Sequence, residues 1–321
     1  SSMTKNVLLT GGFGTLGGRI SANLSKNPEI KLRLASRQKR QPPSWAPNAE
    51  VCVIDFENQN SIKQMLQKVT HVVHLAALND YECRAEPEKA KLVNVEYTRR
   101  VVEQAGQLNK LRFIYLSTIQ VYGNNLSGVI SETSPTDPKD AYSQTHLDAE
   151  RIVEQAHNSQ QLEGIRLRSA NGFGAPMSPD AKIWQIIAND LCRQAVETKK
   201  LTLKSHGLQF RNFVPFTDVC SAVHHSLEMS KQHAGNGLFN LGGKRSLQII
   251  QMAELVATRC EVVLGFTPKI EKPNETPNSV PPAFEYSSDK LLATGLKLNC
   301  DIEKEIDSLL QSCKNWFKFQ N

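Results

Sequence analysis

The chain has 321 residues, of which 40% are hydrophobic and 22% are charged, a length and balance typical of a folded protein rather than a disordered one. The net charge of +6 permits an anionic ligand, but the basic residues form no arm interleaved with aromatic residues, so we expect no nucleic-acid partner. No apolar run approaches the roughly 20 residues that span a bilayer, which predicts no membrane insertion.

Short strand-like runs alternate with helical stretches through the first half of the chain. This alternation predicts an α/β fold, a doubly wound parallel sheet with helices on both faces. The predicted strands are residues 6–10, 31–36, 51–54, 71–75, 112–117 and 164–169. The predicted helices are residues 16–26, 61–67, 89–108 and 140–156.

The second half is less regular, and a loop with four prolines is expected at Lys272–Pro282. We predict a dinucleotide-binding domain that spans residues 3–170 and is rejoined by residues 212–242. Residues 171–211 and 243–321 would form a smaller substrate-binding lobe over the carboxyl ends of the strands, where ligands bind in such sheets.

The seven cysteines are scattered, without a CxxC pair or a cysteine–histidine cluster at metal-ligand spacing. This pattern favours reduced thiols and a cytoplasmic location, and it predicts no metal site. The first residues lack the charged-then-apolar order of a secretion signal. We interpret Ser1 and Ser2 before Met3 as the remnant of an expression tag.

A glycine-rich turn joins the first strand to the first helix. The run Thr10-Gly-Gly-Phe-Gly-Thr-Leu-Gly17 satisfies GxGxxG, in which glycines allow a tight turn and a close backbone approach to a pyrophosphate. The following helix N-terminus offers free N–H groups to phosphates. The residues predicted to bind the dinucleotide here are Gly11, Gly14, Thr15, Leu16 and Gly17.

The end of the second strand predicts which dinucleotide is bound. An acidic residue is expected there for a free 2′-hydroxyl, but this chain has Ser36 and Arg37, which suit a 2′-phosphate. We therefore predict NADP, with NAD as the alternative. Asp55 and Phe56, after the third strand, are expected to border the adenine.

Several further motifs follow in order: His74-Leu-Ala76-Ala77, Asn94, Ser117-Thr118, Tyr142, Arg168-Ser-Ala-Asn171 and the stretch around Arg211. Together with the glycine loop they make the chain resemble the extended short-chain dehydrogenase/reductase family, in particular its nucleotide-sugar epimerases, dehydratases and reductases. The resemblance runs through nearly the whole chain. It implies a nucleotide-diphosphate sugar as substrate and a homodimer formed through helices 89–108 and 140–156.

The resemblance also assigns roles to residues. Thr118 and Tyr142 would hydrogen-bond the reacting sugar oxygen, with Tyr142 exchanging a proton while the nicotinamide exchanges a hydride. Asn171 and Arg211 would hold the diphosphate, because an arginine fork fits phosphate geometry. Ala76, Ala77 and Asn94 would contribute to the cofactor site.

Two departures from the family pattern narrow the reaction. Family dehydratases carry Thr-Asp-Glu where this chain has Thr118-Ile119-Gln120, so no acid or base for elimination is present there. The family's lysine, which orients the nicotinamide ribose and lowers the pKa of the tyrosine, is replaced by His146, one helical turn after Tyr142. By the resemblance His146 belongs to the catalytic and cofactor sites, and it can still hydrogen-bond a ribose hydroxyl. An ordinary histidine is mostly neutral at pH 7, so it favours the phenolate of Tyr142 less than a lysine does.

These departures leave three hypotheses. The leading one is an NADP(H)-dependent reductase of a nucleotide-linked 4-keto sugar, because reduction starts from neutral phenol. The alternative is a 4-epimerase or 4-dehydrogenase. A hypothesis of another class is a catalytically silent protein of the same fold that binds the cofactor without turnover.

Overall fold

A computed structural model of the chain describes residues 4–108 and 110–320. Ser1, Ser2 and Met3, the last being the predicted start of the first domain, lie outside the described residues, as do Asn109 and Asn321.

The centre of the molecule is a sheet of seven strands in the order β11-β7-β5-β4-β1-β2-β3, in which every neighbouring pair is parallel. The predicted doubly wound sheet is confirmed. The order reverses beside β1, which pairs with both β2 and β4, and this switch point is where such sheets open a ligand crevice. The strands are β1 (Lys5–Thr10), β2 (Ile30–Ser36), β3 (Glu50–Val53), β4 (His71–His74), β5 (Arg112–Thr118), β7 (Glu163–Ser169) and β11 (Leu238–Leu241).

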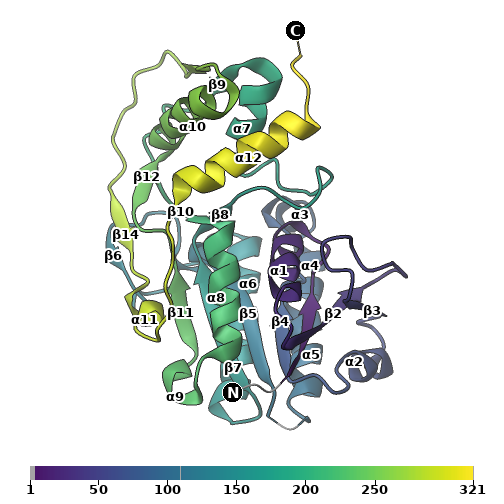
Figure 1. Cartoon of the computed structure of the whole chain (residues 1–321). Coiled ribbons are helices and arrows are strands. Elements are labelled where there is room, and N and C mark those ends of the chain that lie inside the picture. Colours follow the sequence, from purple (N-terminus) through teal and green to yellow (C-terminus); the bar gives the residue numbers. More distant parts are fainter. Residues whose placement is uncertain (1–3, 109, 321) are drawn as a thin grey trace.

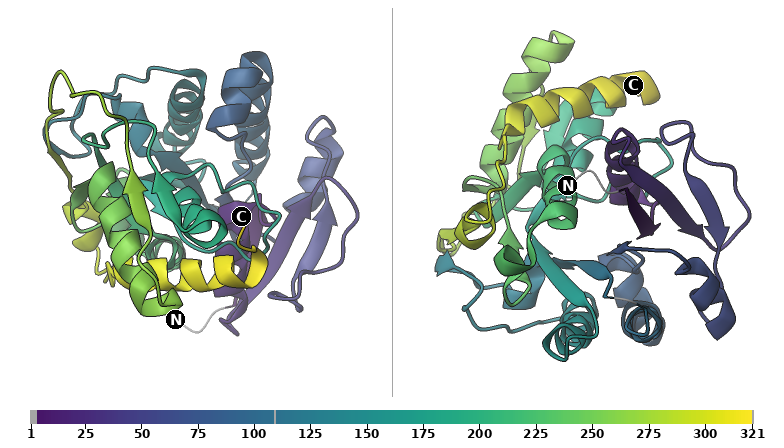
Figure 2. Two further views of the ribbon diagram at one scale, coloured as in Figure 1. Left: turned by 90° about the horizontal axis from the view of Figure 1, so that it is seen from above. Right: turned by 60° about the horizontal axis from the view of Figure 1, so that its bottom comes forward.

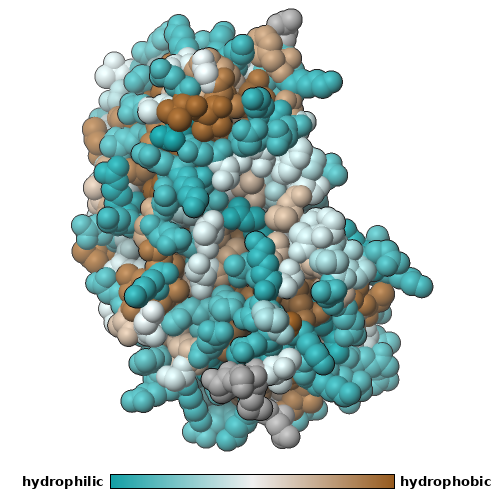
Figure 3. Space-filling model, in the orientation of Figure 1, coloured by the Kyte–Doolittle hydropathy of each residue, from teal (hydrophilic) through white to brown (hydrophobic). Residues whose placement is uncertain are grey.

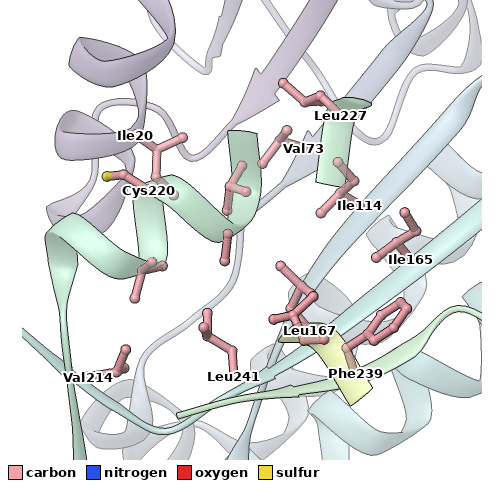
Figure 4. Packing of buried hydrophobic residues seen from close by; sticks show 14 of the residues in the cluster. Ile20, Val73, Ile114, Ile165, Leu167, Val214, Cys220, Leu227, Phe239 and Leu241 are labelled. Atoms are coloured by element: carbon pink, nitrogen blue, oxygen red, sulfur yellow. The ribbon is translucent and has the colours of Figure 1, made fainter. Parts of the chain in front are cut away.

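Helices cover both faces of this sheet (Figure 1). On one face lie α1 (Thr15–Ser25) and α8 (Phe216–Glu228), whose side chains Ile20 and Leu227 pack with Ile114 and Leu167 of the sheet (Figure 4). The other face has a separate buried cluster. It is covered by α2 (Gln59–Met65), α5 (Tyr97–Ala105) and α6 (Ala141–Asn158).

The long helix predicted at residues 89–108 is divided in the structure. It consists of α4 (Pro87–Ala90), a π-helical segment η1 (Lys91–Glu96) and α5. A short helix, α3 (Asp80–Ala85), precedes it and was not predicted, because six residues are too few for a clear apolar period. The side chains of Asn79 and Glu82 cap the start of α3 reciprocally.

A smaller lobe lies beyond the carboxyl ends of the strands (Figures 1 and 2). Three helices pack around its own core: α7 (Ile187–Thr198), α10 (Ile249–Leu264) and α12 (Ile302–Trp316). Among the described residues, three small sheets lie outside the central one: β12 (Ser246–Gln248) with β10 (Phe210–Pro215) and β8 (Asn171–Phe173), β13 (Lys269–Glu271) with β9 (Lys200–Thr202), and β14 (Phe284–Tyr286) with β6 (Gly128–Ile130). The remaining short helices are η2 (Ile119–Tyr122), α9 (Lys231–Ala234) and α11 (Asp289–Leu292).

The connection between β13 and β14 carries no helix or strand over residues 272–282, as the prolines predicted. The face in Figure 3 is mostly hydrophilic, with a hydrophobic patch over the lobe. Within the described part of the chain, no helix is long and apolar enough to cross a membrane.

Candidate active site

The glycine loop after β1 has the geometry of a phosphate cradle. Gly11 has a φ of +71°, and a Cβ added to Gly17 would lie 1.9 Å from the carbonyl oxygen of Gly11. Neither position tolerates a side chain without moving the backbone. The turn is closed by a hydrogen bond from the Gly14 N–H to the Gly11 carbonyl, 3.0 Å long.

The N-terminus of α1 leaves its first N–H groups free to meet an anion. Its N-cap is Gly14, which has no side chain to accept a bond, and the first turn contains no acidic residue. Unpaired N–H groups and the helix dipole together favour a phosphate at this end. The loop therefore fits the pyrophosphate of a dinucleotide.

A cavity of about 630 Å³ extends from the glycine loop across the carboxyl ends of β4 and β5. Most predicted cofactor residues line it: Gly11, Gly14, Thr15, Leu16, Gly17, Ala76, Ala77 and His146. Thr118 and Tyr142 line its far end. The structure therefore brings the glycine loop and the predicted catalytic pair into one cavity.

A smaller recess of about 190 Å³ adjoins the glycine loop at the end of β2. Its lining includes Ser36, Arg37 and Phe56 but no acidic residue. The Ser36 hydroxyl is occupied, because it donates to the Gln38 carbonyl at 2.7 Å and accepts from the Gln38 N–H. Arg40, which also lines the recess, stacks on Phe13 at 3.9 Å.

Two predicted cofactor residues line none of these cavities. The Asp55 carboxylate accepts a hydrogen bond from the Glu57 N–H at 2.9 Å. Asn94, from the π-helical segment, is buried and binds the Leu78 N–H at 2.8 Å and the Thr145 hydroxyl at 3.0 Å. Asn94 thus holds the loop after β4 against α6, next to the cavity that starts at the glycine loop, which is named the cofactor cavity after the ligand predicted to bind there.

A second cavity, of about 600 Å³, lies between the sheet and the lobe. Asn171 and Arg211 line it, together with Thr118 and Tyr142. The Arg211 guanidinium is half-buried and donates a hydrogen bond to the Phe210 carbonyl at 3.0 Å. It forms no ion pair with any acidic side chain of the described residues. Burial lowers its pKa. A partly desolvated, unpaired guanidinium favours an anionic ligand.

Thr118 and Tyr142 line both large cavities, so they stand where a cofactor and a substrate would meet. Burial raises the pKa of Tyr142 to about 12, the negative charges of Asp80 and Cys83 add to the rise, and a hydrogen bond from Thr118 opposes it. The phenol is therefore protonated at neutral pH. At this pH Tyr142 can act as a proton donor.

His146 lies on the same face of α6 as Tyr142, with the two ring centres 4.6 Å apart. Burial lowers the pKa of His146 to about 4, so the imidazole is neutral at pH 7. Its Nδ1 is 2.7 Å from the Tyr115 hydroxyl. His146 therefore supplies no positive charge to Tyr142. The sequence had predicted only that a histidine would be mostly neutral and would favour the phenolate less than a lysine does.

Two buried side chains, Arg168 and Tyr122, belong to a polar network and line neither of the two large cavities. Arg168 is buried and forms a bidentate ion pair with Glu150. It also donates to the Tyr122 hydroxyl at 3.0 Å, and Tyr122 in turn binds Asn240 at 2.6 Å. This network joins α6 to the sheet below the site.

Sequence reasoning missed the contribution of α3. Asp80 lines the second cavity, and its Oδ1 is sealed from solvent without a hydrogen-bond partner, 3.8 Å from the Arg84 side chain. Ile119 and Gln120 also line this cavity, and neither can transfer a proton. No group of three or more potential metal ligands occurs in residues 4–108 and 110–320.

The chain is similar in sequence to known proteins. Residues 7–242 match the model of the NAD dependent epimerase/dehydratase family. The chain is 26% identical over 264 residues to dTDP-D-glucose 4,6-dehydratase of Mus musculus, covering 79% of this chain and 72% of that protein.

Solved structures share the fold. A UDP-glucuronic acid 4-epimerase from Bacillus cereus in complex with NAD is 22% identical, with a TM-score of 0.79 and coverage of 98% of this chain and all of that one. A UDP-glucose 4-epimerase from Thermotoga maritima in complex with UDP-glucose is 20% identical, with a TM-score of 0.79 and coverage of 97% and 99%.

Proposed function

The chain belongs to the NAD dependent epimerase/dehydratase family, as its predicted resemblance to the extended short-chain dehydrogenases/reductases implied, and from this premise we propose that it reduces a nucleotide-diphosphate 4-keto sugar. The observation that carries the proposal is the position of Thr118 and Tyr142. Both residues line the cavity that starts at the glycine loop and the cavity that contains Arg211.

The chemistry divides between the cofactor and the chain. When bound, the nicotinamide supplies or accepts the hydride. In reduction, Tyr142 donates its phenolic proton to the carbonyl oxygen as that oxygen becomes a hydroxyl, and the tyrosinate is then reprotonated from solvent. Thr118 hydrogen-bonds Tyr142 in this structure, and in the proposed reaction it orients the reacting oxygen.

The protonation states favour this direction. Tyr142, with a pKa of about 12, is a phenol at pH 7, and His146, with a pKa of about 4, adds no cation. Forming the phenolate needed for oxidation at pH 7 costs about 7 kcal/mol in the chain alone. A 4-keto substrate requires no such step before reaction.

The second cavity has polar side chains that suit the diphosphate of a sugar nucleotide. Arg211 and Asn171 lie where a diphosphate can meet an unpaired guanidinium and an amide donor. The solved structures of similar fold include complexes with UDP-sugars, which supports a nucleotide sugar as the ligand class.

We further propose NADP as the preferred cofactor. No acidic residue lines the recess at the end of β2, whereas Arg37 and Arg40 do. No ion pair joins Arg37 to an acidic residue in the described ranges, so its charge is available to a 2′-phosphate. The similar structures contain NAD, so NAD is the cofactor against which this preference is measured.

A 4-epimerase is the second candidate, favoured by the fold of the similar 4-epimerase structures. It would need both oxidation and reduction at the same Tyr142. Dehydration is favoured by the similar curated proteins, but Ile119 and Gln120 offer no acid or base at that point of the cavity.

The experiment is to incubate the protein with NADPH or NADH and a panel of UDP- and dTDP-linked 4-keto sugars, following absorbance at about 340 nm. Consumption of NADPH with one of them is the expected result, and Tyr142→Phe should lower kcat at least about 100-fold. Reaction of no keto sugar with either cofactor would contradict the proposal.

The same protein preparation distinguishes a reductase from a 4-epimerase and from a dehydratase. The released cofactor is identified by mass spectrometry, and UDP-glucose, UDP-glucuronic acid and dTDP-glucose are incubated with oxidised cofactor. A changed sugar configuration without net cofactor change indicates an epimerase, and a 4-keto-6-deoxy product indicates a dehydratase. An active protein in which Tyr142→Phe has no effect would remove Tyr142 from the chemistry.

A further inference from the structure

We propose that Tyr115 is a positioning residue that fixes His146 as a neutral imidazole with its proton on Nε2, available as a hydrogen-bond donor to the cofactor ribose. The first half of this inference is a property of the protein alone. The second half rests on the proposed function only in assuming that a nicotinamide dinucleotide occupies the cavity beside His146.

The contact between the two side chains is close and sealed. Tyr115 lies in the middle of β5 and His146 in the second turn of α6, and they are 2% and 5% exposed. The Tyr115 hydroxyl is 2.7 Å from Nδ1 of His146, and the rings are 5.8 Å apart. Tyr115 belongs to the cluster on the α6 face of the sheet, so neighbouring side chains hold its ring in place.

The chemistry of the two groups determines which one donates. Burial raises the pKa of Tyr115 well above 10, so its hydroxyl keeps its proton. A buried hydroxyl without an acceptor loses its hydrogen bond and costs about 1–3 kcal/mol. The acceptor within reach in the described structure is Nδ1 of His146. Tyr115 is therefore the donor, and Nδ1 carries no proton.

The proton of a neutral imidazole must then be on Nε2. Nε2 has no hydrogen-bond partner in the described part of the chain, and it is not among the polar atoms sealed from solvent without one. His146 lines the cofactor cavity. Nε2–H is consequently open to that cavity and can donate to a ribose hydroxyl.

The titratable groups around His146 do not make its imidazole protonated at neutral pH. The groups facing the pair are His74, Cys83, Asp140, Tyr142 and Glu150. Burial lowers the pKa of His74 to about 4 as well, so His74 is neutral. Asp140 favours the charged form of His146, but burial outweighs it.

The pair therefore provides one of the two functions of the family's lysine and omits the other. The donor to the ribose is kept, whereas the cation that makes Tyr142 more acidic is absent. Because the ring is already neutral, this donor should persist unchanged from weakly acidic to alkaline pH.

The test uses ¹⁵N-labelled histidine in the full chain and NMR of the imidazole nitrogens. The His146 signals, assigned with His146→Gln, should show an Nε2–H tautomer with no titration between about pH 5.5 and 9. In Tyr115→Phe, Nδ1 loses its donor, so the two tautomers should become mixed. The dissociation constant of NADP(H), measured by calorimetry, should rise roughly five- to tenfold.

The matched control is Tyr286→Phe, which removes a buried hydroxyl that donates to the Arg168 carbonyl at 2.8 Å. It should leave both the His146 signals and cofactor affinity unchanged. An Nδ1–H tautomer, or titration of His146 near pH 6.5, in the unaltered chain would overturn the proposal. Unchanged His146 signals in a folded Tyr115→Phe, verified by circular dichroism, would also overturn it.

If Tyr115→Phe does not fold, the tautomer and titration of the unaltered chain still decide the first half. Failure of the proposed reaction is distinguishable from failure of this inference. The NMR measurement needs neither substrate nor turnover, and cofactor binding is measured without a sugar.

Discussion

Restoring a lysine beside Tyr142 should make this site a better oxidation catalyst. The perturbation is His146→Lys, at a position whose ring centre is 4.6 Å from that of Tyr142. An ammonium about 6 Å from the phenolic oxygen, at an effective dielectric constant near 20, stabilises the phenolate by about 3 kcal/mol, or about two pKa units. The pKa of Tyr142, about 12 in the present chain, should therefore fall to roughly 10.

The sign of the effect on rate follows from the form of Tyr142 that reacts. Oxidation of an alcohol starts from phenolate, and below the pKa the phenolate fraction rises about tenfold for each unit by which the pKa falls. At a fixed pH near 8 the oxidative rate should thus rise by up to about 100-fold. Reduction starts from the phenol, which still predominates at that pH, so its rate should change little.

The assay is the pH dependence of NADP⁺ reduction by the nucleotide sugar that the reductive reaction yields. The matched control is His146→Gln, which is neutral. In this variant the pH at which the oxidative rate is half-maximal should stay near that of the unaltered chain. Because lysine leaves the Tyr115 hydroxyl without an acceptor, His146→Lys is also measured in a Tyr115→Phe background. A His146→Lys midpoint equal to that of His146→Gln would refute the electrostatic reasoning.

The ionisation of Tyr142 can be followed without any substrate. Ultraviolet difference spectra near 295 nm report phenolate, and the contribution of Tyr142 is the difference between each variant and the same variant carrying Tyr142→Phe. The expected result is ionisation about two pH units lower with lysine than with histidine.

Three further predictions rest on the structure, and a fourth rests on the family resemblance. Arg37→Ala should weaken NADP binding at least about tenfold and leave NAD binding nearly unchanged in parallel titrations, because its guanidinium lines the recess without an acidic partner. Arg211→Met should weaken UDP binding roughly ten- to 100-fold by calorimetry, with cofactor affinity retained. Asp80→Asn removes a negative charge that raises the pKa of Tyr142, so Tyr142 should ionise at lower pH in difference spectra. The homodimer implied by family resemblance, through residues 89–108 and 140–156, predicts twice the monomer mass in light scattering, and a monomer at working concentration would contradict it.

The sequence predicted the features whose determinants lie close together in the chain. Gly11 and Gly17 belong to one turn, and their need for glycine follows from that turn. Tyr142 and His146 are one helical turn apart, so their shared face follows from the helical period. The alternation of strands and helices indicated the parallel sheet, and a parallel sheet gathers the ends of its strands at one edge. Thr118 ends β5 and lines the same cavity as the glycine loop after β1.

What only the tertiary structure decided depends on contacts between distant segments and on burial. Tyr115 meets His146 across 31 positions of the chain, and Asn94 meets Thr145 across 51, and no local pattern encodes either contact. The neutral state of His146 and the high pKa of Tyr142 result mainly from desolvation, which depends on how completely the surrounding elements exclude water. The sequence alone determined that a tyrosine and a histidine share the catalytic face. The packing of β5 against α6 determined the state of this histidine, because it excludes water from the imidazole, which lowers its pKa, and brings Nδ1 to the Tyr115 hydroxyl.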